Sequence, residues 1–309
     1  MTTPAVPGGL AVFERGWLSS NNVLLHGLPG EPAVLVDSSH CLHAAQTVSL
    51  VRNALGSGAT LGRVVNTHLH SDHCGGNATL AREFGASIVI PPGEAGAVAR
   101  WDEDALSYRA TGQRMERFAH DAVLRPGESF EVGGRRWTAL GAPGHDPHSL
   151  VLFDARDGVL ISADALWANG FGVVFPELDG EAAFADVATV LDDMERLAPR
   201  LVVPGHGAPF SDVADALSRA RSRLAAWLAD PARHLRHGAK VLLKYHLLEE
   251  QAQSLPALQA WWAATPLAQA IWHRLGAPDG SVAAWGTGLV DELVASGALQ
   301  RRADMVHDA

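Results

Sequence analysis

The sequence HLHSDH at residues 68–73 is the feature that most restricts how this chain folds. It places three imidazole groups and one carboxylate directly after residues 63–67, which have the length and composition of a buried strand. A hydrophobic core has no use for such groups, whereas a divalent metal ion is held by them. The pattern therefore predicts a strand that ends in a metal site, with further ligands supplied by other segments.

Three more candidate ligands follow along the chain, each just after a predicted strand. His145 follows the strand 135–140, Asp164 follows the strand 159–162, and His206 follows the strand 201–203. Both histidines stand in a Pro-Gly-His triplet, in which the Pro-Gly pair turns the chain sharply. Because loops at strand ends present side chains to a shared cleft, we expect these residues to meet residues 68–73.

Strands and helices alternate through the N-terminal part of the chain. The predicted strands are 33–37, 63–67, 87–90, 128–132, 135–140, 149–153, 159–162 and 201–203, and the predicted helices are 42–55, 77–84 and 181–197. This order indicates a layered α/β fold. Residues 94–120 are charged and mostly helical in pattern, and we interpret them as an insertion beside the ligand loops. Long helices without β alternation follow, which divides the chain into a catalytic domain, 1–212, and a helical C-terminal domain, 213–309.

Composition narrows the class of protein. Hydrophobic residues make up 47% of the 309 positions, enough for a sizeable core. The formal charge of −10 disfavours nucleic acid as a partner. Two cysteines fit a reducing compartment, and we find neither a signal peptide nor a stretch of about 18 apolar residues that would span a membrane. We therefore expect a cytoplasmic protein that acts on a small molecule, without a membrane partner.

The order His-x-His-x-Asp-His, followed by His145, Asp164 and His206, resembles the metallo-β-lactamase-fold hydrolase superfamily over about residues 20–210. The resemblance implies an αβ/βα sandwich with a dinuclear metal site, usually zinc, at one edge. One metal would be held by His68, His70 and His145, and the other by Asp72, His73 and His206. Asp164 would bridge the two.

The ligand set indicates hydrolytic chemistry. Two divalent ions lower the pKa of bound water enough to supply a bridging hydroxide at neutral pH, which suits attack on an ester, thioester, lactone or related carbonyl substrate. Asp72 is the candidate catalytic residue, since its carboxylate would orient the hydroxide and pass a proton to the leaving group. Zinc is expected, although imidazole and carboxylate ligands also suit iron or manganese.

The branch of the superfamily is less sharply indicated. Asp164 is typical of the hydroxyacylglutathione hydrolase and lactonase branches, whereas β-lactamases usually lack it. We locate no basic C-terminal patch for glutathione, and Trp167 stands where lactonases tend to place a tyrosine. Residues 289–299 resemble the helix and wing of a winged-helix-like appendage found on some relatives. That region is interpreted as a cleft wall, a homodimer surface or a packing buttress.

Two rival functions and several weaker site residues remain. An iron-dependent sulfur dioxygenase on the same scaffold would use only His68, His145 and Asp164, and a phosphodiesterase is a second rival. Trp167 and Phe171 are candidates for a substrate wall or for plain packing. His148 is a candidate to donate a hydrogen bond to a ligand carboxylate, to contact the substrate, or only to stabilise the turn in which it stands. Four histidines of the C-terminal half, His234, His237, His246 and His273, are expected on solvated helix faces.

Overall fold

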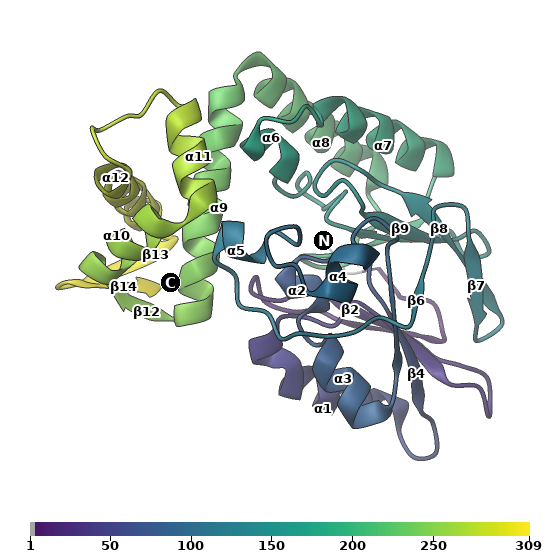
Figure 1. The fold of residues 1–309 in the computed structure, drawn as a ribbon. Coiled ribbons are helices and arrows are strands. Elements are labelled where there is room, and N and C mark those ends of the chain that lie inside the picture. The colour runs from purple at the N-terminus through teal and green to yellow at the C-terminus, as the bar shows by residue number, and fades with distance from the viewer. Residues whose placement is uncertain (1–3) are drawn as a thin grey trace.

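The computed structural model describes residues 4–309, and its centre is a pair of β-sheets packed face to face (Figure 1). The first sheet has the strand order β1-β2-β3-β4-β5-β6. Its strands are β1 (Leu10–Phe13), β2 (Asn22–Leu25), β3 (Ala33–Val36), β4 (Leu61–Val65), β5 (Ser87–Ile90) and β6 (Ala122–Val123). The strands from β3 to β6 run parallel, so the carboxyl ends of β3, β4 and β5 lie at one edge of the sheet.

The second sheet has five strands in the order β11-β10-β9-β8-β7. Its strands are β7 (Ser129–Val132), β8 (Arg135–Gly141), β9 (Leu150–Asp154), β10 (Val159–Ala163) and β11 (Leu201–Pro204). Alternate residues of both sheets meet in one buried layer, in which Val36 and Val65 from the first sheet join Trp137 and Ile161 from the second. The period-two alternation of these strands therefore builds the centre of the sandwich.

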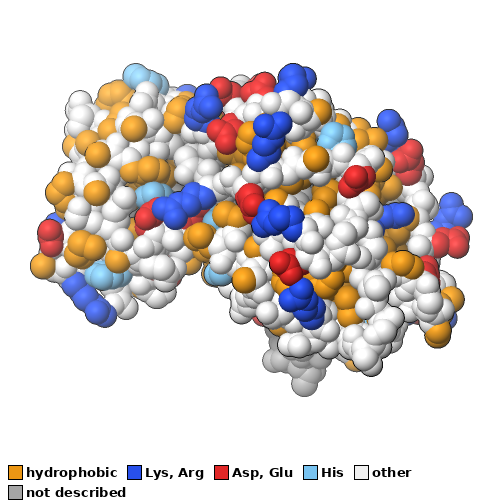
Figure 2. Space-filling model, turned by 60° about the horizontal axis from the view of Figure 1, so that its bottom comes forward, with side chains coloured by type: hydrophobic (Ala, Val, Ile, Leu, Met, Phe, Trp, Pro, Cys, Tyr) orange, Lys and Arg blue, Asp and Glu red, His pale blue; other side chains and the backbone are white. Residues whose placement is uncertain are grey.

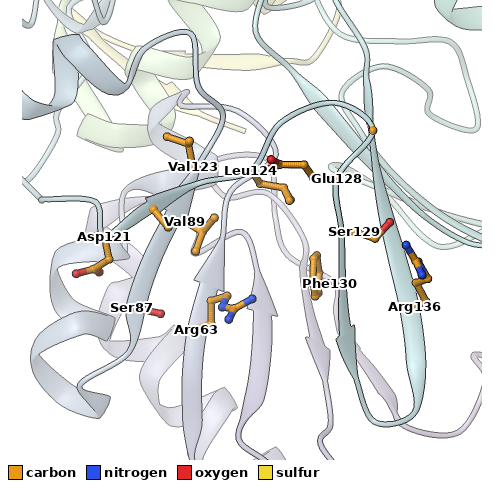
Figure 3. A pocket seen from close by; sticks show the side chains of 12 residues that line it. Arg63, Ser87, Val89, Asp121, Val123, Leu124, Glu128, Ser129, Phe130 and Arg136 are labelled. Carbon is orange, nitrogen blue, oxygen red and sulfur yellow. The ribbon is translucent and has the colours of Figure 1, made fainter.

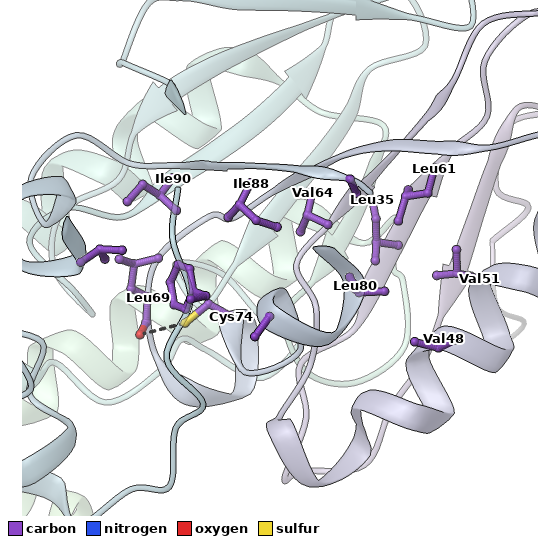
Figure 4. Packing of buried hydrophobic residues seen from close by; sticks show 14 of the residues in the cluster. Leu35, Val48, Val51, Leu61, Val64, Leu69, Cys74, Leu80, Ile88 and Ile90 are labelled. Carbon is purple, nitrogen blue, oxygen red and sulfur yellow. Dashed lines mark hydrogen bonds between the residues drawn. The ribbon is translucent and has the colours of Figure 1, made fainter. Parts of the chain in front are cut away.

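Helices cover the outer faces of both sheets. On the first sheet, Val48 and Val51 of α1 (Ala44–Leu55) and Leu80 of α3 (Asn77–Phe84) pack toward Leu35 and Val64 (Figure 4). On the second sheet, α7 (Phe184–Leu197) and α8 (Val213–Ala229) bury their apolar faces in an equivalent cluster. Each fully buried Val or Leu contributes about 1.5–3 kcal/mol of transfer free energy. The predicted αβ/βα sandwich is thus confirmed.

The segment 94–120 contains less helix than its sequence pattern indicates. It forms only α4 (Ala95–Arg100) and α5 (Tyr108–Thr111), and then runs without helix to residue 120. Gly112 ends α5 in a left-handed conformation. Ion pairs hold the extended part that follows: Glu116 binds Arg82 at 2.6 Å, and Arg114 pairs with Glu250. The charges that favour an amphipathic helix are instead used to fasten this segment to its neighbours.

The C-terminal region has a core of its own. It is built by α9 (Pro231–Glu250), α10 (Leu255–Ala264), α11 (Pro266–Arg274) and α12 (Val282–Ala295). A three-stranded sheet, of which the sequence analysis anticipated only a small wing after the last helix, joins β12 (Ala252–Ser254) to the hairpin of β13 (Leu299–Arg302) and β14 (Met305–Asp308). No helix within residues 4–309 combines the length and apolarity that a membrane crossing needs.

The surface carries charges of both signs. Acidic and basic side chains lie interspersed across the two lobes that Figure 2 shows. Several of them are paired, as in Arg109 with Asp104 at 3.0 Å and Arg221 with Asp192 at 2.8 Å. Exposed pairs of this kind contribute little to stability, about 0–1 kcal/mol each.

Candidate metal centre

The cluster at residues 68–73 is placed by the end of β4 and by a one-turn helix, α2 (Ser71–Cys74). The chain leaves β4 at Val65, and the next residues are pinned by the carboxylate of Asp37. Its Oδ1 accepts a hydrogen bond from the Thr67 amide and its Oδ2 one from the Thr67 hydroxyl, both at 2.8 Å. These two hydrogen bonds fix the position of the backbone directly before His68.

The other three ligand-type residues come from loops at the ends of β8, β10 and β11, and two glycines let them approach. A Cβ atom on Gly205 would lie 2.2 Å from Oδ1 of Asp164, and one on Gly172 would lie 2.5 Å from Nδ1 of His145. Only glycine allows backbone so close to these groups. The seven side chains are therefore gathered at one edge of the sandwich, and each is at most 8% exposed.

Three imidazoles form the first group. Nδ1 of His70 lies 3.1 Å from Nε2 of His68 and 2.8 Å from Nε2 of His145. The second nitrogen of His145 bonds to the carbonyl of Val173 at 2.6 Å, which leaves a lone pair on its Nε2. The second nitrogen of His68 similarly faces the Thr67 hydroxyl at 3.2 Å. Two lone pairs thus converge on a third nitrogen, which can donate a proton to only one of them.

Two histidines and two aspartates form the second group. Oδ2 of Asp72 lies 3.0 Å from Nε2 of His206 and 3.6 Å from Nε2 of His73. Oδ1 of Asp164 lies 3.5 Å from Nε2 of His73, while its Oδ2 lies 3.3 Å from Nε2 of His145 in the first group. The carboxylate of Asp164 therefore faces both groups, one oxygen to each.

The charge states differ between the two groups. Burial, with the neighbouring imidazoles, holds the pKa of His68 well below its ordinary value and lowers that of His70 to about 4. For His73, burial is outweighed by the carboxylates of Asp72, Asp164 and Asp37, so its pKa is raised. Burial also opposes ionisation of Asp72, but His73 and His206 lower its pKa to about 2. Neutral imidazoles and ionised carboxylates are the forms that bind a divalent ion.

The donor set fits a pair of divalent cations. Nε2 of His73 is buried and has no hydrogen-bond partner among the described residues, although its Nδ1 bonds to Asp37 at 2.8 Å. One metal ion would bind this atom in the second group, and another would bind the lone pairs that converge in the first group. The ligand atoms of each group lie within 4.8 Å of one another, a spread that suits Zn–N and Zn–O distances of about 2.0–2.2 Å.

Aromatic rings border the ligands on two sides. Trp167, a predicted wall residue, donates from Nε1 to Oδ1 of Asp164 at 3.2 Å. Trp17, which the sequence analysis did not single out, is 59% exposed and stacks on His206 with ring centroids 5.2 Å apart. Phe175 lies against His70 at 4.6 Å. No ligand-type residue stands near Trp17 in the sequence, so only the fold reveals its position.

The two other candidate substrate residues lie elsewhere. Phe171 is 2% exposed and packs edge-to-face on Trp227 at 5.3 Å, inside the core of the second sheet. His148 is exposed, its amide bonds to Asp146 at 2.8 Å, and its ring lies over Gly93. The structure gives His148 no hydrogen bond to any of the seven ligand-type residues.

A tyrosine does reach the centre, but from the far end of the chain. The hydroxyl of Tyr245, on α9, lies 2.9 Å from Oγ of Ser71, a residue that stands between His70 and Asp72. The two residues are 174 positions apart in the sequence. No local pattern connects them, which is why the sequence analysis left Tyr245 out of the site.

The cavity shown in Figure 3 is separate from the ligands. It has a volume of about 570 Å³ and opens between the edge strands β6 and β7. Arg63, Val89 and Phe130 are among its lining residues, and none of the seven ligand-type residues is. The chemistry therefore centres on the buried histidines and aspartates rather than on this cavity.

Comparison with known proteins shows the family to which the chain belongs. The family model of the metallo-beta-lactamase superfamily matches residues 15–206, more than half of the chain. Over 118 residues the chain is 31% identical to a hydroxyacylglutathione hydrolase of Methylococcus capsulatus, a match that covers 38% of this chain and 39% of that protein. The chain thus spans about two fifths of the length of the first curated relatives that it matches.

Longer matches are weaker in identity. A hydroxyacylglutathione hydrolase of Acidiphilium cryptum is 28% identical over 235 residues, which cover 75% of this chain and 83% of that protein. The crystal structure of a metallo-beta-lactamase family protein from Thermus thermophilus covers 99% of this chain and 100% of its own, with a TM-score of 0.57 and 21% identity. At that identity the likeness shows the fold, including a counterpart of the C-terminal region.

Proposed function

Because this chain belongs to the metallo-beta-lactamase superfamily, we propose that it is a metal-dependent hydrolase that cleaves an ester, thioester, lactone or related carbonyl substrate. The observation that carries the proposal is the convergence of seven ligand-type side chains in two groups, with Asp164 facing both. We assign His68, His70 and His145 to one divalent ion and Asp72, His73 and His206 to another, with zinc as the expected metal.

Divalent ions held there supply Lewis acidity, which activates both a carbonyl group and water for hydrolysis near neutral pH. The protein's part is to aim the imidazoles at the ions. The carbonyl of Val173 and the carboxylate of Asp37 do so by accepting hydrogen bonds from the outer nitrogens of His145 and His73. Partners of this kind fix which nitrogen faces the metal.

Asp72 is the residue we propose to handle the proton. Its carboxyl is 8% exposed, and its pKa of about 2 keeps it ionised at neutral pH. Oδ2 is occupied by His206 at 3.0 Å, while the structure gives Oδ1 no hydrogen bond. An ionised oxygen at the rim of the centre accepts a hydrogen bond from water, orients it for attack, and carries its proton briefly to the leaving group.

The rings around the ligands indicate where the substrate lies. Trp17 and Trp167 flank His206, with their ring centroids 5.7 Å apart, and Phe175 borders the opposite group. We propose that these three rings contact an apolar part of the substrate next to its carbonyl group. Phe171 has no part in this wall, because its ring is enclosed in the core.

One experiment tests the proposal and its main rival together. The metal content of the freshly purified protein is measured, and hydrolysis of matched ester, thioester, lactone and β-lactam substrates is followed with and without a chelator. The proposal predicts two divalent ions per chain, hydrolysis of at least one carbonyl class, and loss of that activity on chelation. About one iron and no zinc per chain would instead favour a sulfur dioxygenase that uses His68, His145 and Asp164.

A further inference from the structure

The helix α9 contacts two segments of the metal centre and its surroundings, although it belongs to the C-terminal region. His234 near its beginning contacts the segment that supports His145, and Tyr245 near its end contacts α2. Eleven residues separate them, which is about 16 Å along a helix. One rigid element therefore reaches the surroundings of both groups of ligands.

The contact at His234 passes through a single peptide group. The carbonyl of Val173 accepts a hydrogen bond from Nδ1 of His145 at 2.6 Å, and the next amide, that of Val174, donates to Nε2 of His234 at 3.1 Å. These two atoms belong to the same planar peptide unit. The ligand His145 and the helix residue His234 are thus connected end to end by one rigid group.

The surroundings of His234 keep its imidazole neutral, so that one ring nitrogen can accept a hydrogen bond. Its side chain is 1% exposed and packs against Phe184 and Trp227, with ring centroids 5.3 Å and 4.5 Å away. Burial lowers its pKa to about 3, with smaller contributions from His237 and Arg274. The imidazole is therefore neutral at physiological pH. Its Nε2 accepts the hydrogen bond from the Val174 amide, so its own proton stands on Nδ1.

We propose that His234 is a positioning residue that fixes His145 as a metal ligand through the peptide between Val173 and Val174. By accepting from the amide end, His234 holds this peptide plane in place and polarises its carbonyl, which strengthens the bond from Nδ1 of His145. Nε2 of His145 then keeps its lone pair and its direction toward His70 and Asp164. The inference rests on the proposed metal centre but not on the reaction catalysed there.

Tyr245, at the other end of α9, can be compared with His234 because it contacts the metal centre by a different route. Tyr245 holds Ser71, between His70 and Asp72, and a buried pair of His40 with Glu249 at 2.9 Å fastens the helix four residues further on. Tyr245 has no hydrogen bond to the 173–174 peptide. Changes at His234 should therefore affect the ion held by His145, and Tyr245→Phe should not affect it through this route.

The test compares two substitutions of His234 that have similar size but differ in how well they accept a hydrogen bond from the Val174 amide. His234→Gln keeps a strong acceptor for the Val174 amide, whereas His234→Met offers only the weakly accepting sulfur of a thioether. His237→Met removes an exposed imidazole from the same helix as a control. Metal-free full-length protein is titrated with Zn²⁺ against a chromophoric chelator, without substrate. We expect His234→Met to weaken one of the two binding steps about 10–100-fold, as loss of a ligand's hydrogen-bonding partner typically does. The other step, His234→Gln and the control should stay within about threefold of the parent, well below that range.

The inference is overturned if His234→Met binds both ions as the parent does, or if His234→Gln loses as much affinity as His234→Met. If His234→Met does not fold, the unaltered protein labelled with ¹⁵N-histidine decides. A proton on Nδ1 of His234 with an unprotonated Nε2 supports the inference, and a proton on Nε2 contradicts it. Neither measurement depends on finding a substrate, so failure here is distinct from failure of the proposed hydrolase activity.

Discussion

Gly205→Ala is the perturbation whose effect follows most directly from the structure. The added Cβ would lie 2.2 Å from Oδ1 of Asp164 and 3.0 Å from a ring carbon of His73. The backbone has no freedom to retreat, since the Gly205 amide bonds to Ala163 and its carbonyl to the Asn21 amide, both at 2.7 Å. Ordinary contacts begin near 3.4 Å, so the Asp164 carboxylate must move by about 1 Å.

That displacement sets the expected magnitude. A shift of about 1 Å in a catalytic group lowers turnover on the order of 100-fold. The carboxylate that faces both groups would also hold its ions less tightly, so we expect metal loss on dialysis. The φ angle of Gly205 lies outside the left-handed region, so an alanine is not excluded by backbone strain.

The assay follows metal content after dialysis and kcat with the best substrate of the panel. Gly288→Ala, in α12, is the matched control, because a Cβ there meets nothing within 4 Å. Alanine should stabilise that helix by about 0.5–1 kcal/mol and leave the metals in place. If Gly205→Ala keeps two ions and the parent's rate, the placement of Asp164 against Gly205 is wrong.

Four further predictions follow. Asp72→Asn should keep part of its metal but lose at least about 100-fold in kcat, and a loss below about tenfold would exclude a central role in proton handling. Removal of metal by a chelator should lower the melting temperature, because ions at 100 times their Kd stabilise by about 2.7 kcal/mol, and an unchanged midpoint after verified removal would refute this. Burial opposes the charge on His40, but bonds to Cys41 and Glu249 raise its pKa to about 9. The stability from this pair is therefore complete below pH 6.5 and is lost as the pH rises through about 9, so His40→Gln should flatten that decline in melting temperature. Trp17→Ala should raise KM for substrates with a large apolar group and leave metal content unchanged, and an equal change for acetyl and bulky substrates would argue against the wall.

The fold and the ligand-type residues were predictable because their signals are local. Residues 68–73 lie within one strand-to-helix turn. His145 and His206 can each be identified from a Pro-Gly-His triplet. Several central strands of the sandwich are short apolar runs, as expected of strands that are buried on both faces. The α/β fold and the superfamily follow from these features, and both are confirmed.

The surroundings of the site depend on contacts that no local pattern encodes. His234 lies on a helix with arginine and lysine nearby, which favours a solvated face, yet α9 turns it onto the Val174 amide. Trp17 and Tyr245 reach the ligands from opposite ends of the chain. The short strands β12, β13 and β14 have too few residues for their alternation to stand out against helices.

The central claim is that Asp164 stands between two cations held by the six other side chains. Crystals grown with zinc and measured on both sides of the zinc absorption edge test this most directly, since anomalous scattering locates each ion. We predict two peaks per chain, both within coordinating distance of the Asp164 carboxylate. A single peak, or two peaks of which one lies away from residues 68–73 and His206, would contradict the account.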